Sequence, residues 1–188
     1  MIRRKLFLSL GAAAFVSACT TTNPDISGSA SSKRQKIDAG VTSALSKLVA
    51  QVPDSRNLMA LARGILVFPS VLSAGFVVGG SYGQGALLEG GRTTGYYSTV
   101  AASVGLLAGA ESKAVYILFM TQDALDKFKA SRGWAVGADA SVTMIKAGAS
   151  ASVDTQTARN PVIGYALSNA GLMASLSLDG TKITPLNL

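Results

Sequence analysis

One stretch near the middle of the chain, Ala62–Gly80, limits most strongly what this sequence can fold into. It passes through Gly64, a residue type that commonly ends a helix, and continues as the apolar run Ile65–Phe68 before Pro69. A short apolar run with these boundaries is typical of a buried strand. Helical periodicity precedes the stretch, and short apolar segments rich in glycine and alanine follow it. The chain therefore changes from helix to sheet at this point.

The composition predicts one domain without catalytic machinery. The chain has 188 residues, of which 48% are hydrophobic and 14% charged, so it is long enough for one sizeable core. It has no histidine and a single cysteine, which removes the commonest general base and metal ligand and excludes an intrachain disulfide. The few carboxylates have no spacing typical of acid–base catalysis or calcium binding. We therefore expect a protein that is not an enzyme and has no metal or cofactor.

One motif superficially suggests an esterase. The run Gly79-Gly80-Ser81-Tyr82-Gly83 fits the G-x-S-x-G pattern of a nucleophile elbow. An elbow requires a helix directly after the serine and a histidine base, but the residues after Ser81 predict a strand and the chain has no histidine. The glycine spacing does not fit a dinucleotide-binding fingerprint either. We interpret the motif as structural.

The first 18 residues have the layout of a secretory signal peptide. A basic start is followed by the apolar run Leu6–Val16 and then by small residues ahead of Cys19. This end resembles a bacterial lipobox, in which the cysteine receives fatty acyl chains of the palmitate type and becomes the mature N-terminus. Thr20 at the next position favours delivery to the outer membrane. The alternative is an ordinary cleavage after Ala18, which would give a soluble periplasmic protein with a free thiol at Cys19.

The segment after the lipobox predicts a tether and then a basic amphipathic helix. Residues 19–32 are mostly small and polar and predict a flexible tether. Apolar residues then recur at helical spacing from about Ser32 to Val52, ahead of Pro53. Lys33, Lys36 and Lys47 fall together on one flank of the apolar stripe, from which long side chains reach phosphate groups of a membrane. The alternative is a solvated flank of a helix that packs on the domain core.

The rest of the chain predicts two more helices and a strongly bent sheet. Asp54 or Ser55 caps a short helix that ends near Gly64, and Thr121 caps another that ends near Gly133. Strands are predicted at residues 65–68, 75–89, 92–100, 101–110, 114–120, 138–144, 162–168, 172–178 and 181–183, with turns at 90–91, 111–113 and 179–180. The predicted fold class is α+β and mainly β, a small antiparallel β-barrel-like core with about three helices on its surface. Scarce aromatic residues disfavour a transmembrane barrel.

An ordered series of short motifs resembles the SYLF domain family of lipid-binding modules. The resemblance covers about Lys36 to Leu188. It is carried by Ala62–Pro69, Ala74–Phe76, Gly83–Gly85, Tyr97-Ser98, Gly105, Leu118–Thr121, Gly137–Ala140, Tyr165 and Gly171-Leu172. The resemblance implies a barrel-like β core with surface helices and a weak affinity for phosphoinositide-type or other anionic lipid headgroups. We therefore divide the chain into a signal peptide (1–18), a tether (19–32) and a SYLF-type domain (33–188).

The leading functional hypothesis is a lipoprotein that binds anionic headgroups at the cell envelope. Removal of three basic residues with the signal peptide lowers the formal charge from +7 to +4, too diffuse a charge for nucleic acid. The candidate headgroup ligands are Lys33, Arg34, Lys36, Arg92 and Arg159, with lipidation at Cys19. Their binding is expected to be weak and salt-sensitive. The alternatives are a carrier of a small apolar ligand inside the barrel and a structural or interaction protein of the envelope.

Overall fold

The computed structural model of the chain describes residues 30–145, 160–169, 171–173 and 178–188, and the side chains of all these except residues 76–78 and 103–109. The signal peptide, Cys19 and most of the tether lie outside the described residues. So does Arg159. The predicted strand at residues 172–178 is described only in part.

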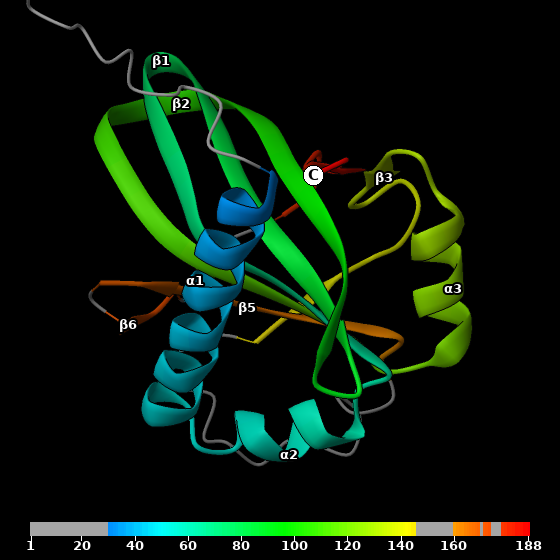
Figure 1. The fold of residues 1–188 in the computed structure, drawn as a ribbon. Coiled ribbons are helices and arrows are strands. Elements are labelled where there is room, and N and C mark those ends of the chain that lie inside the picture. Colours follow the sequence, from blue (N-terminus) through cyan, green and yellow to red (C-terminus); the bar gives the residue numbers. More distant parts are fainter. Residues whose placement is uncertain (1–29, 146–159, 170, 174–177) are drawn as a thin grey trace, which may run out of the picture.

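The described part of the chain folds into three helices and a seven-stranded sheet that curls into a half-barrel (Figure 1). The helices are α1 (Ala30–Gln51), α2 (Ser55–Leu61) and α3 (Gln122–Ala130). The strands are β1 (Gly64–Glu89), β2 (Arg92–Phe119), β3 (Trp134–Ala135), β4 (Thr143–Met144), β5 (Val162–Ser168), β6 (Gly171–Leu172) and β7 (Lys182–Pro185). The predicted fold class, mainly β with a barrel-like core and three helices, is confirmed.

β1 and β2 form one long antiparallel ribbon that is joined by the predicted turn at Gly90-Gly91. Both glycines have positive φ values, 57° and 79°, as a two-residue hairpin turn of this kind requires. The pairing runs from Glu89 opposite Arg92 to Gly64 opposite Phe119, with three shifts in register. Such irregularities bend a sheet. The ribbon arches over in its middle, at the top of Figure 1.

The prediction of separate strands on either side of residues 111–113 is wrong. Glu111, Ser112 and Lys113 pair with Ser73, Leu72 and Val71 of β1, so β2 continues through them. Their turn propensity is outweighed because a partner strand satisfies their backbone groups. Pro69 does not end its strand either, because the register shift between Phe68 and Val71 places it at a bulge.

The C-terminal third differs most from the prediction. The expected strand at residues 138–144 is reduced to β4, because residues 137–140 form a turn in which Gly137 has φ 91° and its N–H donates to the Ala140 carbonyl at 2.9 Å. β4 pairs with β5 in parallel, which departs from an all-antiparallel sheet. The predicted turn at Asp179-Gly180 is confirmed by the bond from the Thr181 N–H to the Leu178 carbonyl at 3.0 Å.

The sequence predicted a hairpin between the residues on either side of this turn, but within the described residues β7 has other partners. It pairs with β2 along Tyr97–Val100 on one side and with Trp134–Ala135 of β3 on the other. Both edges of β7 at Lys182 and Ile183 are therefore occupied by other strands.

The sheet has a separate apolar core on each face. Leu66 and Phe68 pack on the face that carries α3, whereas Val67 between them packs under α1 and α2. Successive residues of a strand point to opposite faces, and here both faces are buried. The first core also contains Leu87 and Tyr97, which come from the other half of the ribbon, so the two halves share one interior.

The crossing of the ribbon over itself depends on glycine. A Cβ at Gly85 would collide with the carbonyl of Val67, and a Cβ at Gly83 would lie 2.9 Å from the carbonyl oxygen of Ser70. These two positions let one half of β1 lie directly against the other. They belong to the Gly83–Gly85 motif, which therefore has a structural role.

Candidate functional site

The first two turns of α1 carry a cluster of exposed cations. Lys33, Arg34 and Lys36 are all exposed, and the first turn contains no acidic residue. Within the described part of the chain none of the three forms an ion pair. Cations near a helix N-terminus are opposed by the helix dipole. This placement therefore does not serve the stability of the helix.

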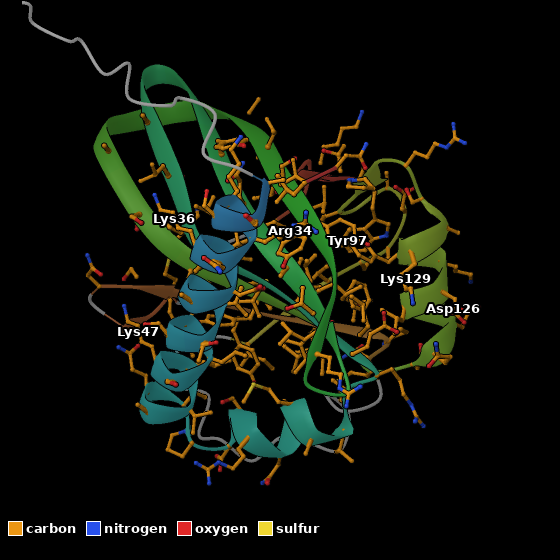
Figure 2. All side chains as sticks on the ribbon, in the orientation of Figure 1. Arg34, Lys36, Lys47, Tyr97, Asp126 and Lys129 are labelled. Atoms are coloured by element: carbon orange, nitrogen blue, oxygen red, sulfur yellow. The ribbon has the colours of Figure 1, made fainter. Side chains whose placement is uncertain are left out.

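The cations divide between two flanks of α1. Figure 2 shows Lys36 and Lys47 on one flank and Arg34 on the other. On the Arg34 flank, Asp38 accepts hydrogen bonds from the Tyr96 hydroxyl at 2.8 Å and the Thr93 hydroxyl at 3.0 Å. Burial, followed by the bond to Asp38, raises the pKa of Tyr96, so the phenol stays protonated and donates. This flank of α1 is thus fastened to β2.

The other flank, with Lys33, Lys36 and Lys47, borders a shallow groove of about 230 Å³. Gly40, Ser43, Lys47, Pro69, Ser112, Lys113 and Asn169 are among the residues that line it, and no carboxylate is among the described lining residues. The Lys47 ammonium donates to the Ser168 carbonyl at 3.3 Å, a long bond that leaves donors available. Amines, hydroxyls and an amide without a competing carboxylate suit a phosphate group.

Arg92 lies on a different face from this flank. It pairs in register with Glu89, so both side chains leave the same face of the ribbon. Glu89 forms an ion pair of 2.8 Å with Lys129 of α3, and this hydrogen bond is the main cause that holds the pKa of Glu89 below its usual value. Arg92 therefore belongs to the α3 side, and the structure does not bring it together with Lys33 and Lys36.

The half-barrel encloses a second hollow, a cavity of about 340 Å³ between the two halves of the ribbon. Its apolar wall is formed by Phe68, Val71, Val115, Ile117, Leu178 and Ile183, and polar or charged residues at its edge include Ser73, Ser81, Glu111, Lys113 and Asp179. Ser81 lies inside β1 with strand on both sides, which confirms the predicted strand after it. The nucleophile-elbow motif therefore lacks the strand–helix geometry of an elbow.

Sequence reasoning found the lysine flank and offered a ligand cavity inside the barrel as an alternative, but it missed the groove beside α1. The groove depends on Asn169 and Lys113, which lie far from α1 in the sequence. Arg56 and Arg63 also border a third hollow of about 440 Å³, against Leu88 and the Gly90-Gly91 turn. Sequence periodicity does not predict which distant residues line the same hollow, because the pairing of distant strands brings them together.

The described residues contain neither a cluster suited to a metal ion nor a helix suited to a membrane span. No group of three or more acidic, cysteine or histidine side chains is placed to hold a metal ion in this part of the chain. None of the helices described here combines the length and apolarity needed to cross a bilayer.

A half-barrel with helices on both faces, an exposed basic flank and three hollows characterises this β-rich domain. The family model described as "Ysc84: Las17-binding protein actin regulator" matches residues 100–187. This match supports the resemblance to the SYLF family over residues 100–187. It begins inside β2, so four of the five headgroup candidates, Lys33, Arg34, Lys36 and Arg92, lie outside it. No curated protein matches the chain.

Proposed function

We propose that the protein binds anionic lipid headgroups, of the phosphoinositide type, at a membrane of the cell envelope and catalyses no reaction. The observation that carries the proposal is the exposed group of Lys33, Arg34 and Lys36 at the start of α1, without an acidic partner among the described residues. Their position at the positive end of the helix dipole is unfavourable for the helix and favourable for an approaching anion. The match of residues 100–187 to the family model supports a binding role of this kind.

The groove beside Lys47 extends this surface toward β5. A membrane phosphate that approaches the flank meets Lys33 and Lys36 first and then the hydroxyl, amide and ammonium groups of the groove. Each cation near an anionic surface contributes about 1 kcal/mol, and salt screens this contribution. Binding through the flank alone is therefore weak and falls steeply with ionic strength.

Acyl chains on Cys19 complete the proposal, because they hold the domain where weak binding is sufficient. The eleven peptide links from Cys19 to Ala30 span at most roughly 40 Å when fully extended. The start of α1 thus stays within that distance of the bilayer. The corresponding location is the outer membrane. In the alternative, a soluble periplasmic protein, the same flank would bind lipid without this gain in local concentration.

Vesicle co-sedimentation of the mature full chain tests the headgroup contacts. Wild type is expected to bind phosphatidylglycerol and phosphatidylinositol-4-phosphate vesicles at low salt and to bind phosphatidylcholine vesicles weakly. Lys33→Glu/Lys36→Glu should lower binding at least about tenfold, since it reverses two contacts of about 1 kcal/mol each. The matched control, Lys127→Glu/Arg132→Glu, changes the net charge equally at two exposed positions on and after α3. Equal losses in the two variants would reduce the effect to net charge and refute a site on α1.

Mass spectrometry of the protein purified from membranes tests the anchor. Acylation should appear as a mature N-terminus at Cys19 with added fatty acyl mass. Cys19→Ser should leave the chain without acyl groups and move it to the soluble fraction. An unmodified Cys19 in the wild-type protein would contradict the lipoprotein hypothesis and leave the flank hypothesis to the vesicle experiment.

A further inference from the structure

The cavity inside the half-barrel is a second binding feature, and among the described residues that line it only Lys113 also lines the groove beside α1. Buried core side chains form its wall, including Phe68 and Val71, which are 1% and 4% exposed. Its volume of about 340 Å³ lies within the range of ligand sites, roughly 300–1,000 Å³. The interior is therefore large enough for one short alkyl chain.

The cavity exists because the residues at the arch are small. Ser81 pairs with Ala101, and both side chains leave the same face of the ribbon and line the cavity. Larger apolar residues there would fill the void and gain packing contacts, because protein interiors are normally close-packed. Gly83 and Gly85, next along β1, have another reason to be small, since backbone lies against them. At Ala101 and Ser81 the side chains line the cavity instead.

The mouth of the cavity carries charges of both signs. Glu111 and Lys113 are two residues apart on β2, so they share a face, and both line the cavity. No ion pair joins them within the described part of the chain. Asp179 lines the same cavity. A purely anionic head would meet the Glu111 carboxylate as well as the Lys113 ammonium, whereas a zwitterionic head has a partner for each sign.

From these observations we infer that the half-barrel binds a single-chain zwitterionic lipid of the lysophosphatidylethanolamine class. The alkyl chain occupies the cavity between the two halves of the ribbon. The ammonium of the head lies toward Glu111, and its phosphate lies toward Lys113. This site does not depend on the proposed binding of anionic headgroups by α1.

Isothermal titration calorimetry of the mature full chain with lauroyl-lysophosphatidylethanolamine, kept below its micellar concentration, tests the inference. Saturable binding is expected, roughly tenfold tighter than binding of lauroyl-lysophosphatidylglycerol, whose head is anionic. Ala101→Phe should reduce affinity at least tenfold while the melting temperature stays equal or rises, because the ring fills the void. Ser81→Leu is a second, smaller filling change, so the test does not depend on one variant folding.

Val100→Phe is the matched control for the filling variants. Val100 is next to Ala101, but it is 51% exposed and points to the opposite face, so this variant should bind like wild type. Glu111→Gln/Lys113→Gln should abolish the preference between the two heads while chain binding remains. Lys33→Glu/Lys36→Glu should leave affinity unchanged, which separates this site from the surface of α1.

Three results would overturn the inference. The first is the absence of saturable binding by wild type. The second is unchanged affinity in both folded filling variants. The third is equal or tighter binding of the phosphatidylglycerol analogue together with loss of binding in Lys33→Glu/Lys36→Glu, which would place the lipid on α1 instead.

Discussion

The two ends of the folded ribbon are built in opposite ways. At the end where Phe119 meets α3, the space is filled by four aromatic rings, and Phe128 lies 4.9 Å from Tyr97, 4.8 Å from Phe119 and 5.4 Å from Trp134 between ring centroids. At the arch, the small side chains of Ser81 and Ala101 do not fill the space between the strands, so a cavity remains. The comparison teaches that the two ends of one core differ in role. The aromatic end stabilises the curved sheet, and the end at the arch contains the cavity.

The largest expected effect comes from breaking the aromatic end. Phe128→Ala should lower the free energy of unfolding by about 3–5 kcal/mol, because it removes a buried ring and leaves a void. Val71→Ala at the hollow end should cost only about 1.5 kcal/mol, since its neighbours already border open space. Urea denaturation of both variants checks the comparison. Equal losses would show that the two ends are packed alike.

A single added methyl group should disrupt the close approach of the two halves of β1 between the two ends of the ribbon. Gly85→Ala should cost about 1–3 kcal/mol, because the new Cβ collides with the Val67 carbonyl and the backbones must separate. Gly80→Ala is the matched control at the arch, where the nearest atom, the Ala101 carbonyl oxygen, lies 3.8 Å from the new Cβ. Thermal denaturation should show a clear loss for the first variant and little change for the second. A silent Gly85→Ala would contradict the close crossing.

A smaller effect is expected where α1 joins the filled end. The buried Tyr116 hydroxyl donates to the Ala44 carbonyl at 2.7 Å, and burial raises the pKa of Tyr116 to about 12, so the phenol remains neutral below that pH. Tyr116→Phe should lower stability by about 1 kcal/mol. Tyr82→Phe, which changes a half-exposed hydroxyl nearer the arch, should change it by much less. Chemical denaturation of the two variants measures this difference in the free energy of unfolding between the two ends.

The smallest expected effect is the pH dependence of the ion pair between Glu89 and Lys129. Because the pKa of Glu89 is below 4.5 in the folded state, the pair contributes fully above about pH 4.5 and its contribution is lost as the pH falls through the lowered pKa. The pair is partly exposed and should contribute only a few tenths of a kcal/mol. Glu89→Gln should therefore be slightly less stable than wild type at pH 7 and equally stable once the pH is well below the lowered pKa of Glu89. A difference that persists in acid would point to packing instead of charge.

Local signals in the sequence predicted the parts of this fold that local chemistry determines. The Gly90-Gly91 turn, the apolar stripe of α1 and the cap of α3, where the Thr121 hydroxyl accepts from the Ala124 N–H at 3.3 Å, all appear as expected. Asp54 occupies the cap position of α2, but its side chain makes no capping hydrogen bond. The continuity of β2 through residues 111–113 and the parallel pairing of β4 were missed because distant partners decide them.

The candidate site was likewise predictable only in those parts that depend on local sequence. The helical period of 3.6 residues was sufficient to place Lys33, Lys36 and Lys47 on one flank of α1. It carried no information on Asn169 beside Lys47, on the face to which Arg92 points, or on the cavity. These features depend on how β1 and β2 fold back and on which strands join them.

The pairing of β2 also decides which piece of the chain is a folding unit. Tyr97–Val100 in its first half pair with β7, Ala114–Phe119 at its end pair with β5, and β1 pairs along its length from Arg92 to Phe119. The segment matched by the family model starts at residue 100, inside this strand. A fragment expressed from that residue would lose β1 and nearly all of the edge on which β7 is seated. The autonomous unit therefore begins near α1, and a shortened protein made for biophysical work should start no later than that helix.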